Sequence, residues 1–311
     1  MSDVSEITFV VQGPILSRKE VIENIDSIKR NYPEAKIILS TWNGTDVSDI
    51  QVDKVVFNED PGAEYYYYND KKLLNNCNRQ IVSTLNGLKN VDTKYSVKLR
   101  TDINICSKSL LEYIGEIENS VGELFCKKII AVSNLTVNPR RNYPMAFHVS
   151  DFFFFGLNTD LIKLFDIPLL SNIEANWFEH SNFLNLRSRY ANEQYLLVSS
   201  IYKSLKKRPI QHAFDLSEEV LYAHDQMLTK NFLLLTNQDL GFDSTKYKLT
   251  WFGNYDHVYT LKEFKNIDKG LIYRSIPDTE RLRYSLIFYV KKLIYKHSPS
   301  LHEILKKYAK N

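Results

Sequence analysis

Cysteine, glycine and proline are scarce in this sequence, which narrows the classes of protein it can belong to. Its 311 residues include only three cysteines, which form no CxxC pair and are too few for a disulfide framework. A reducing cytoplasm is therefore the expected location. Ten glycines and nine prolines occur without any low-complexity linker or internal repeat. One compact two-part domain with a C-terminal extension is expected.

Long apolar runs and several common motifs are also missing. No run approaches the roughly 18 apolar residues needed to cross a bilayer, and the acidic N-terminus lacks the basic start of a signal peptide. The absence of GxSxG, P-loop and GxGxxG patterns excludes the usual hydrolases, NTPases and dehydrogenases. A net charge of only +3 gives no nucleic-acid-binding footprint, so no nucleic acid partner is expected.

Short apolar, β-branched runs alternate with helical patterns along the first hundred residues. Strands are expected at residues 7–11, 36–40, 53–58 and 95–100, and helices after a capping Ser17 and over 73–88. The less regular second half predicts strands at 152–157 and 232–235 and a helix at 192–206. Such alternation predicts an α/β fold with a mostly parallel central sheet flanked by helices. Ligands of these sheets bind at the carboxyl ends of the strands.

Asp102 follows the strand expected at 95–100, with Asn104 two residues later. A carboxylate and an amide at this spacing can place two oxygen ligands on one Mn²⁺ or Mg²⁺ ion. Arg100 could neutralise the charge of a diphosphate. In the alternative interpretation, Asp102 only caps the turn before a helix near Ser107.

Asn75, Asn78 and Arg79 share one helix face at i, i+3 and i+4. An arginine near the start of a helix, with free backbone donors beside it, suits a phosphate or diphosphate. The same three residues could instead form a solvated polar face opposite Ile81 and Leu85.

Two further carboxylates are candidates for catalysis. Glu193 stands just inside the start of a helix, where it could act as a general base on a sugar hydroxyl or simply stabilise the helix end. Asp151 precedes four phenylalanines and could orient an acceptor hydroxyl or pair with Arg140 or Arg141. The histidines show no metal-ligand spacing, and most are expected to be structural; they include His148, His212, His224 and His257.

Seven segments follow one another in an order that resembles a known family. They read VVQGP, IILSTWNGTDV, VVFNEDPG, NNCNRQIVSTLNGL, KYSVKLRTDI, DFFFFGL and NEQY. The series resembles the WavE family of lipopolysaccharide-synthesis proteins, glycosyltransferases of bacterial surface glycans, over residues 7–247. NNCNRQ and KLRTDI are the most specific segments.

The resemblance implies a GT-A (Rossmann-like) fold and a nucleotide-diphosphate sugar as donor. It implies that Asp102 holds a divalent metal, Mn or Mg, although Asn104 replaces the second acid of the usual motif. Glu193 would supply the base. The expected nucleotide contacts are Gln12, Gly13, Pro14, Thr41 and Trp42, with the Trp42 ring stacking on the base.

This interpretation divides one domain into two halves. Residues 1–106 are expected to bind the nucleotide sugar, and residues 107–273 are expected to bind the acceptor. The acceptor would be a lipid-linked or oligosaccharide chain of a growing lipopolysaccharide or capsule. Two other functions stay open: transfer of a nucleotidyl or polyol-phosphate unit on the same scaffold, and sugar binding by an inactive subunit.

Residues 274–311 form the basic part of the chain, with nine Lys or Arg against three Asp or Glu. Their apolar residues recur at helical spacing, which predicts a basic amphipathic helical tail. Such a tail can lie on an anionic membrane, here the inner face of the plasma membrane, or dock its apolar stripe on the catalytic domain.

Overall fold

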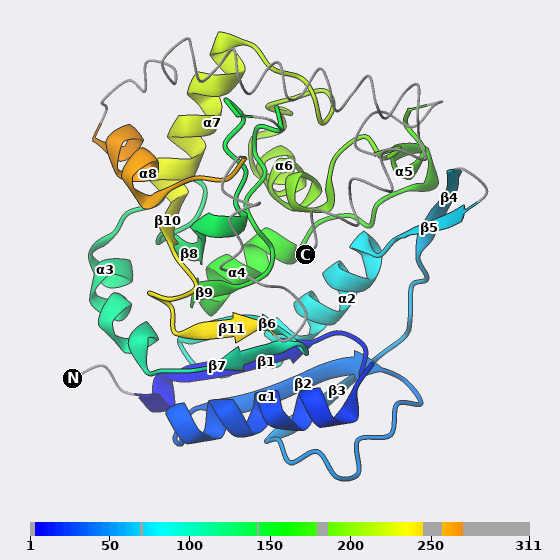
Figure 1. Cartoon of the computed structure of the whole chain (residues 1–311), viewed down its shortest axis with the longest axis vertical. Coiled ribbons are helices and arrows are strands. Elements are labelled where there is room, and N and C mark those ends of the chain that lie inside the picture. Colours follow the sequence, from blue (N-terminus) through cyan, green and yellow to red (C-terminus); the bar gives the residue numbers. More distant parts are fainter. Residues whose placement is uncertain (1–3, 69–70, 142, 179–185, 245–256, 270–311) are drawn as a thin grey trace, which may run out of the picture.

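The computed structural model describes residues 4–68, 71–141, 143–178, 186–244 and 257–269 (Figure 1). Its centre is a seven-stranded sheet in the order β10-β8-β9-β6-β1-β2-β3. The strands are β1 (Ile7–Gln12), β2 (Lys36–Trp42), β3 (Lys54–Asn58), β6 (Tyr95–Arg100), β8 (Ile129–Val132), β9 (Phe154–Leu157) and β10 (Phe232–Leu235). β9 runs antiparallel to β6 and β8, and the other neighbouring pairs are parallel. The α/β class with a mostly parallel sheet is therefore confirmed.

The reversed direction of β9 matters for the position of Asp151. Lys98 on β6 pairs with Phe154 at the start of β9. An antiparallel strand begins at the edge where its parallel neighbours end. The residues that lead into β9, including Asp151, therefore lie at the same sheet edge as Arg100.

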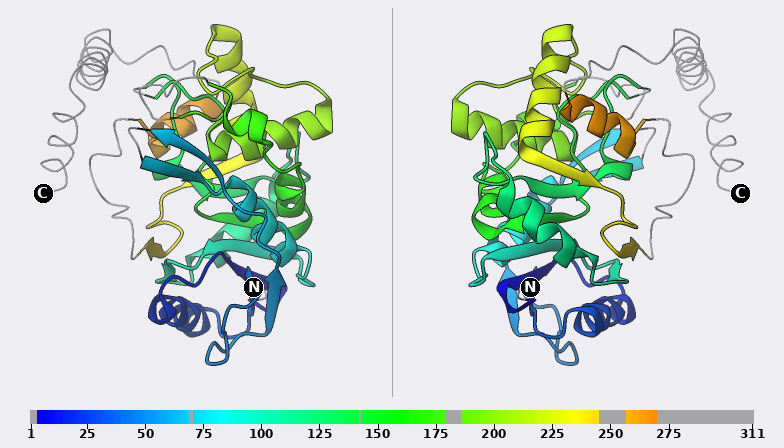
Figure 2. Two further views of the ribbon diagram at one scale, coloured as in Figure 1. Left: turned by 90° about the vertical axis from the view of Figure 1, so that its right-hand side faces the viewer. Right: turned by 90° about the vertical axis from the view of Figure 1, so that its left-hand side faces the viewer.

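Helices cover both faces of the sheet (Figure 1). They are α1 (Arg18–Asn31), α2 (Cys77–Leu88), α3 (Ile114–Asn119), α4 (Asn158–Phe165), α5 (Asn172–Ala175), α6 (Asn192–Leu205), α7 (Glu218–Asn231) and α8 (Leu261–Asp268). Apolar residues of α1 and α3 pack on one face, and those of α2, α4, α6, α7 and α8 form the core on the other. In the side views of Figure 2, α1 and α7 lie at opposite ends of the molecule.

The close packing of α2 on the sheet depends on Gly87. A Cβ atom added there would lie 2.5 Å from Cγ1 of Val10 on β1 and 3.1 Å from Cβ of Ser40 on β2. Any larger residue at this position would push α2 away from the sheet.

The helix expected at 73–88 begins later than the sequence suggests. Residues before it form a hairpin of β4 (Glu64–Tyr68) and β5 (Lys71–Asn75), in which Leu73 pairs with Tyr66. The Asn75 side-chain oxygen accepts a hydrogen bond of 2.9 Å from the backbone nitrogen of Cys77, where the helix starts. The cap at Ser17 is confirmed, since its hydroxyl accepts from the backbone nitrogen of Glu20.

A second small sheet joins β7 (Ile103–Ile105) with β11 (Phe242–Ser244). Among the residues described above, no helix is long and apolar enough to cross a membrane. The basic tail expected at 274–311 lies outside the described residues.

Candidate active site

Five charged side chains gather where β6 ends and β9 begins; we call them the strand-edge cluster. They are Lys98, Arg100, Asp102, Asp151 and Glu193. Their charges act on one another: both carboxylates from the second half of the chain, together with Arg100 and Asp102, influence the pKa of Lys98. Residues from β6, from the start of β9 and from α6 therefore meet at one place.

Lys98 is fully buried at the centre of this cluster. Alternation along β6 directs Val97 and Leu99 into the core on the α1 side and Lys98 to the opposite face. Its ammonium group donates a hydrogen bond to the backbone carbonyl of Asp151. Burial lowers the pKa of Lys98 to about 8, while the charge of Asp151 opposes the shift. This lysine brings a positive charge beneath the candidate site and holds the entry to β9.

Glu193 lies in the first turn of α6 and faces His148. Its carboxylate oxygen is 3.5 Å from His148 Nε2, and the two side chains are 28% and 13% exposed. Burial raises the pKa of Glu193, and the charge of Asp151 raises it further, whereas His148 and Lys98 oppose the shift. A carboxylate whose pKa is raised in this way can accept a proton more readily than an ordinary surface glutamate.

The positions of His148 and α6 are fixed by buried hydrogen bonds. Gln194, next to Glu193, donates to the backbone carbonyls of Ala146 and Ala213 at 2.7 and 3.1 Å. Phe147 is buried in the left-handed backbone conformation (φ 61°), and its nitrogen donates to Nδ1 of His224. A left-handed phenylalanine is costly and persists only where its surroundings impose it. Here it turns the chain so that His148 meets Glu193.

Arg100 and Asp102 form a two-pronged ion pair. Arg100 Nε and Nη2 donate to the two carboxylate oxygens of Asp102 at 2.9 and 2.8 Å, and the guanidinium lies over the Phe152 ring at 5.1 Å from its centre. The Arg100 side chain remains 30% exposed. A planar guanidinium held in this way is suited to meet a diphosphate.

The same ion pair bears on the metal site expected at Asp102 and Asn104. Both carboxylate oxygens of Asp102 already accept from Arg100, and the Asn104 amide oxygen is buried without a hydrogen-bond partner. Within the described part of the chain, no group of three or more His, Cys, Asp or Glu is placed to hold a metal ion. Arg100 therefore already occupies both carboxylate oxygens of Asp102, and a divalent cation held by Asp102 and Asn104 stays a prediction.

Asp151 does not pair with Arg140 or Arg141, as the alternative interpretation had it. Arg140 binds Asp225 through two hydrogen bonds of 2.9 and 2.7 Å, and Arg141 binds Glu263. The Asp151 carboxylate instead accepts from the Gln80 amide of α2. This leaves Asp151 at the strand edge, facing α2.

Amide and hydroxyl side chains of β1, β2, β3 and α2 form a second group, which we call the amide cluster. It consists of Gln12, Ser40, Asn58, Ser83 and Asn86. Asn58 donates to the Ser40 hydroxyl at 2.9 Å and accepts from Asn86 at 2.8 Å, while Ser83 donates to Gln12 at 2.6 Å. These bonds tie α2 to three strands and account for the burial of Gln12.

Three residues expected to share a donor-binding face have different roles. Asn75 ends β5, and its side-chain oxygen accepts from the first backbone nitrogen of α2. Asn78 is 7% exposed, and its amide both donates to and accepts from the backbone of Leu170, at 3.0 and 2.6 Å, so it anchors a loop instead of facing a ligand. Arg79 is 33% exposed and pairs with Asp60 through two hydrogen bonds of 2.8 and 2.7 Å. Arg79 is the only charged side chain of the three, and it is partly exposed to solvent.

The remaining expected nucleotide contacts follow β1 and β2. Gly13 has a positive φ of 120° and donates its nitrogen to the Ser40 carbonyl at 3.0 Å, and the Pro14 carbonyl accepts from Thr101 at 3.2 Å. Thr41 is wholly buried, which leaves its side chain no surface for a ligand. Trp42, the last residue of β2, is partly exposed.

Sequence reasoning missed Lys98 and assigned no role to His148 beyond structure. A signal for Lys98 was present, because a lysine inside an otherwise apolar strand must find a partner when the strand is buried. No pattern in the sequence could place His148, since its contact with Glu193 joins residues 45 positions apart through a left-handed turn.

Comparison with known proteins gives one clear match. The family described as WavE lipopolysaccharide synthesis matches residues 7–298. No curated protein matches the chain in sequence. One solved structure with a similar chain path is 4-diphosphocytidyl-2C-methyl-D-erythritol synthase from Anaerococcus prevotii, at 10% identity and a TM-score of 0.33, covering 56% of this chain and 83% of the other. That similarity is too low to bear on activity. The family match spans nearly the whole chain, which therefore belongs to the WavE lipopolysaccharide-synthesis family.

Proposed function

We propose that this protein is a glycosyltransferase of the GT-A type, which moves a sugar from a nucleotide-diphosphate donor to a growing bacterial surface glycan. The observation that carries the proposal is the pairing of Glu193 and His148 beside the cationic end of β6. A proton acceptor and cations for a leaving group are the two requirements of this reaction, and the strand-edge cluster offers both. Membership of a lipopolysaccharide-synthesis family supports a glycan as the acceptor.

The proposed reaction assigns a role to each group of the cluster. The acceptor hydroxyl oxygen bonds to the anomeric carbon while the bond from that carbon to the diphosphate oxygen breaks. Glu193 takes the hydroxyl proton, and the imidazole of His148, 3.5 Å away, orients its carboxylate. The nucleotide diphosphate leaves with the bonding electron pair, and its charge is balanced by Arg100, with Lys98 adding positive charge from below.

An inactive sugar-binding subunit is the less favoured alternative. Placing a buried lysine beside a half-buried glutamate is costly, and a protein that only binds neutral sugars has no need of a proton acceptor with a raised pKa. We further propose that the acceptor is a lipid-linked or oligosaccharide chain. The protein would act on it at the cytoplasmic face of the inner membrane. Both rest on the expected chemistry of the family's product.

The first experiment tests Glu193 as the base. Thermal-shift measurements with UDP, GDP, CMP and CDP identify the nucleotide, and transfer from the matching labelled sugar is then followed. We expect Glu193→Gln to lower kcat by about 10²–10⁴-fold with little change in donor affinity, because it preserves shape and removes the proton acceptor. The rate of the unaltered protein should fall as pH drops through the raised pKa of Glu193.

Glu219→Gln is a matched control. Glu219 occupies the same position in the first turn of α7 that Glu193 occupies in α6, and its carboxylate bonds the hydroxyl of the capping Ser217. If Glu193 merely stabilises a helix end, the two variants should lose similar stability and neither should lose activity per folded molecule. That result, or transfer of a phosphate-containing group in place of a sugar, would refute the proposal.

A further inference from the structure

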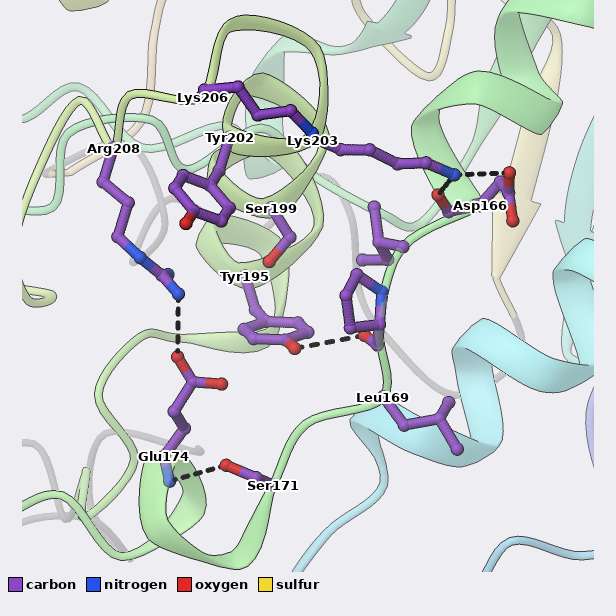
Figure 3. Close-up of a pocket in the computed structure, with 12 residues that line it drawn as sticks. Asp166, Leu169, Ser171, Glu174, Tyr195, Ser199, Tyr202, Lys203, Lys206 and Arg208 are labelled. Carbon is purple, nitrogen blue, oxygen red and sulfur yellow. Dashed lines mark hydrogen bonds and ion pairs between the residues drawn. The ribbon is translucent and has the colours of Figure 1, made fainter.

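A cavity lies on the other side of α6 from the strand-edge cluster. It has a volume of about 600 Å³ and is enclosed by α6, the loop after α4 and the short helix α5 (Figure 3). Small-molecule sites commonly have volumes of about 300–1,000 Å³. The cavity is therefore large enough for a sugar residue.

One stripe of α6 forms a wall of this cavity. It carries Tyr195, Ser199, Tyr202 and Lys203, which follow the i, i+4, i+7 and i+8 spacing of a single helix face, and Lys206 lines the cavity just after the helix ends. Glu193 precedes Tyr195 by two residues, which places it about 200° around the helix. The stripe and the candidate active site therefore occupy opposite faces of one helix.

Of the two tyrosines on the stripe, Tyr195 is buried and Tyr202 is open. Tyr202 is 44% exposed, and the Arg208 guanidinium lies 4.7 Å from the centre of its ring. Tyr195 donates its hydroxyl to the Pro168 carbonyl at 3.1 Å, which fixes that ring across the cavity wall (Figure 3). Tyrosine rings offer apolar faces with a polar rim, a combination that matches the faces and hydroxyls of a sugar ring.

The charges around the cavity favour an anion. Three cations line it, Lys203, Lys206 and Arg208, against two carboxylates, Asp166 and Glu174. Lys203 is tightly paired with Asp166 at 2.6 Å.

Arg208 has a longer ion pair, and its guanidinium also contacts the Tyr202 ring and the Tyr190 side chain. The Arg208 guanidinium is 3.5 Å from a Glu174 oxygen (Figure 3). The same oxygen lies 3.5 Å from Arg189. That separation is well beyond the roughly 2.7–2.9 Å of a strong charge-assisted hydrogen bond. A ligand anion can therefore compete for Arg208.

We propose that this cavity binds a sugar that bears an anionic group, a carboxylate or a phosphate. The ring lies against Tyr202, the anion meets Arg208, and Ser199 and Glu174 bond the hydroxyls. A neutral sugar would place no anion beside Arg208, and a bare anion would place no ring against Tyr202. The inference concerns binding alone and holds independently of the transfer chemistry at Glu193.

The experiment measures binding of four probes by calorimetry: glucuronate, glucose 6-phosphate, glucose and inorganic phosphate. We expect saturable binding of the two charged sugars, about tenfold tighter than either glucose or phosphate alone. A difference between the two charged sugars would tell whether the natural group is a carboxylate or a phosphate. Equal or absent binding of all four probes would overturn the proposal.

Four variants locate the binding. Tyr202→Ala and Arg208→Gln should each weaken the charged sugars about tenfold, whereas Glu174→Gln should tighten them roughly two- to fivefold by removing the competing carboxylate. Tyr222→Ala, which removes a 67% exposed tyrosine outside the cavity, is the control and should change nothing. Unchanged binding in Tyr202→Ala and Arg208→Gln would refute the site. Glu193→Gln should leave this binding intact, so failure here and failure of the proposed transfer can be told apart.

Discussion

The amide cluster and the strand-edge cluster lie along the same edge of the sheet but differ in how their polar groups are satisfied. In the amide cluster, neutral groups bond one another: Asn58 alone has donors and acceptors on Ser40, Thr41 and Asn86. In the strand-edge cluster, Lys98 is wholly buried with a carbonyl as its hydrogen-bond partner, and Glu193 meets His148 at 3.5 Å. The first arrangement is typical of polar groups that stabilise a fold. The second holds charged groups with shifted pKa values, which is typical of catalytic sites.

The largest expected effect that separates the two clusters concerns Lys98. Its pKa in the folded protein, about 8, is below the 10.5 of an ordinary lysine. Between these values the unfolded chain binds a proton that the folded chain does not, so the free energy of unfolding rises with pH across this window. We expect a rise of up to about 3 kcal/mol from this residue, measured by urea unfolding from pH 7.5 to 10.5.

Lys98→Met should remove this slope. Lys36→Met is the control, because Lys36 is exposed and pairs with Asp92, and its slope should match that of the unaltered protein. A Lys98→Met protein that keeps the full slope would mean that the lysine is not the buried charge inferred here. The strand-edge cluster would then resemble the amide cluster.

The next effect concerns the amide cluster itself. Asn58→Ala leaves the Asn86 amide and the Thr41 carbonyl without their buried partner, which should reduce the free energy of unfolding by about 2 kcal/mol. Activity per folded molecule should stay close to normal. Asn43→Ala, which removes an exposed amide bonded to Glu59, should cost no more than about 0.5 kcal/mol. Normal stability with lost activity in Asn58→Ala would place this cluster in the active site.

Six of the seven strands of the central sheet could be predicted because their signal is local, whereas β8 and the short strands of the two small sheets were missed. The run at β1 is buried along its whole length, so six successive residues had to be apolar or internally bonded. The start of α2 could not be predicted, because Leu73 and Leu74 fit a helical pattern equally well and only the pairing with β4 decides between the two. Tertiary contacts overrode the local periodicity.

The candidate site also contains residues that could be predicted from the sequence and residues whose roles could not. Arg100, Asp102, Asp151 and Glu193 could be recognised because strand ends and helix starts are where parallel sheets bind ligands. The sequence could not show that Asn78 is bound to the backbone of Leu170, 92 residues away, or that Asp102 is already paired with Arg100. A residue type and its spacing indicate what a side chain can do, whereas its partners decide what it does.

The smallest expected effect tests that pairing. If Asp102 serves to orient Arg100 toward the diphosphate, Asp102→Ala should weaken donor binding about tenfold, since a displaced guanidinium loses roughly one charge-assisted hydrogen bond. Asp102→Asn retains an oxygen that can accept from Arg100, and it should weaken binding by no more than about threefold. A metal-binding role predicts another pattern: Mn²⁺ should strengthen the nucleotide-induced thermal shift of the unaltered protein, EDTA should abolish that gain, and both variants should lose it equally. Nucleotide binding that is indifferent to EDTA, with Asn better tolerated than Ala, would assign Asp102 to Arg100 and distinguish the strand-edge cluster from a metal centre.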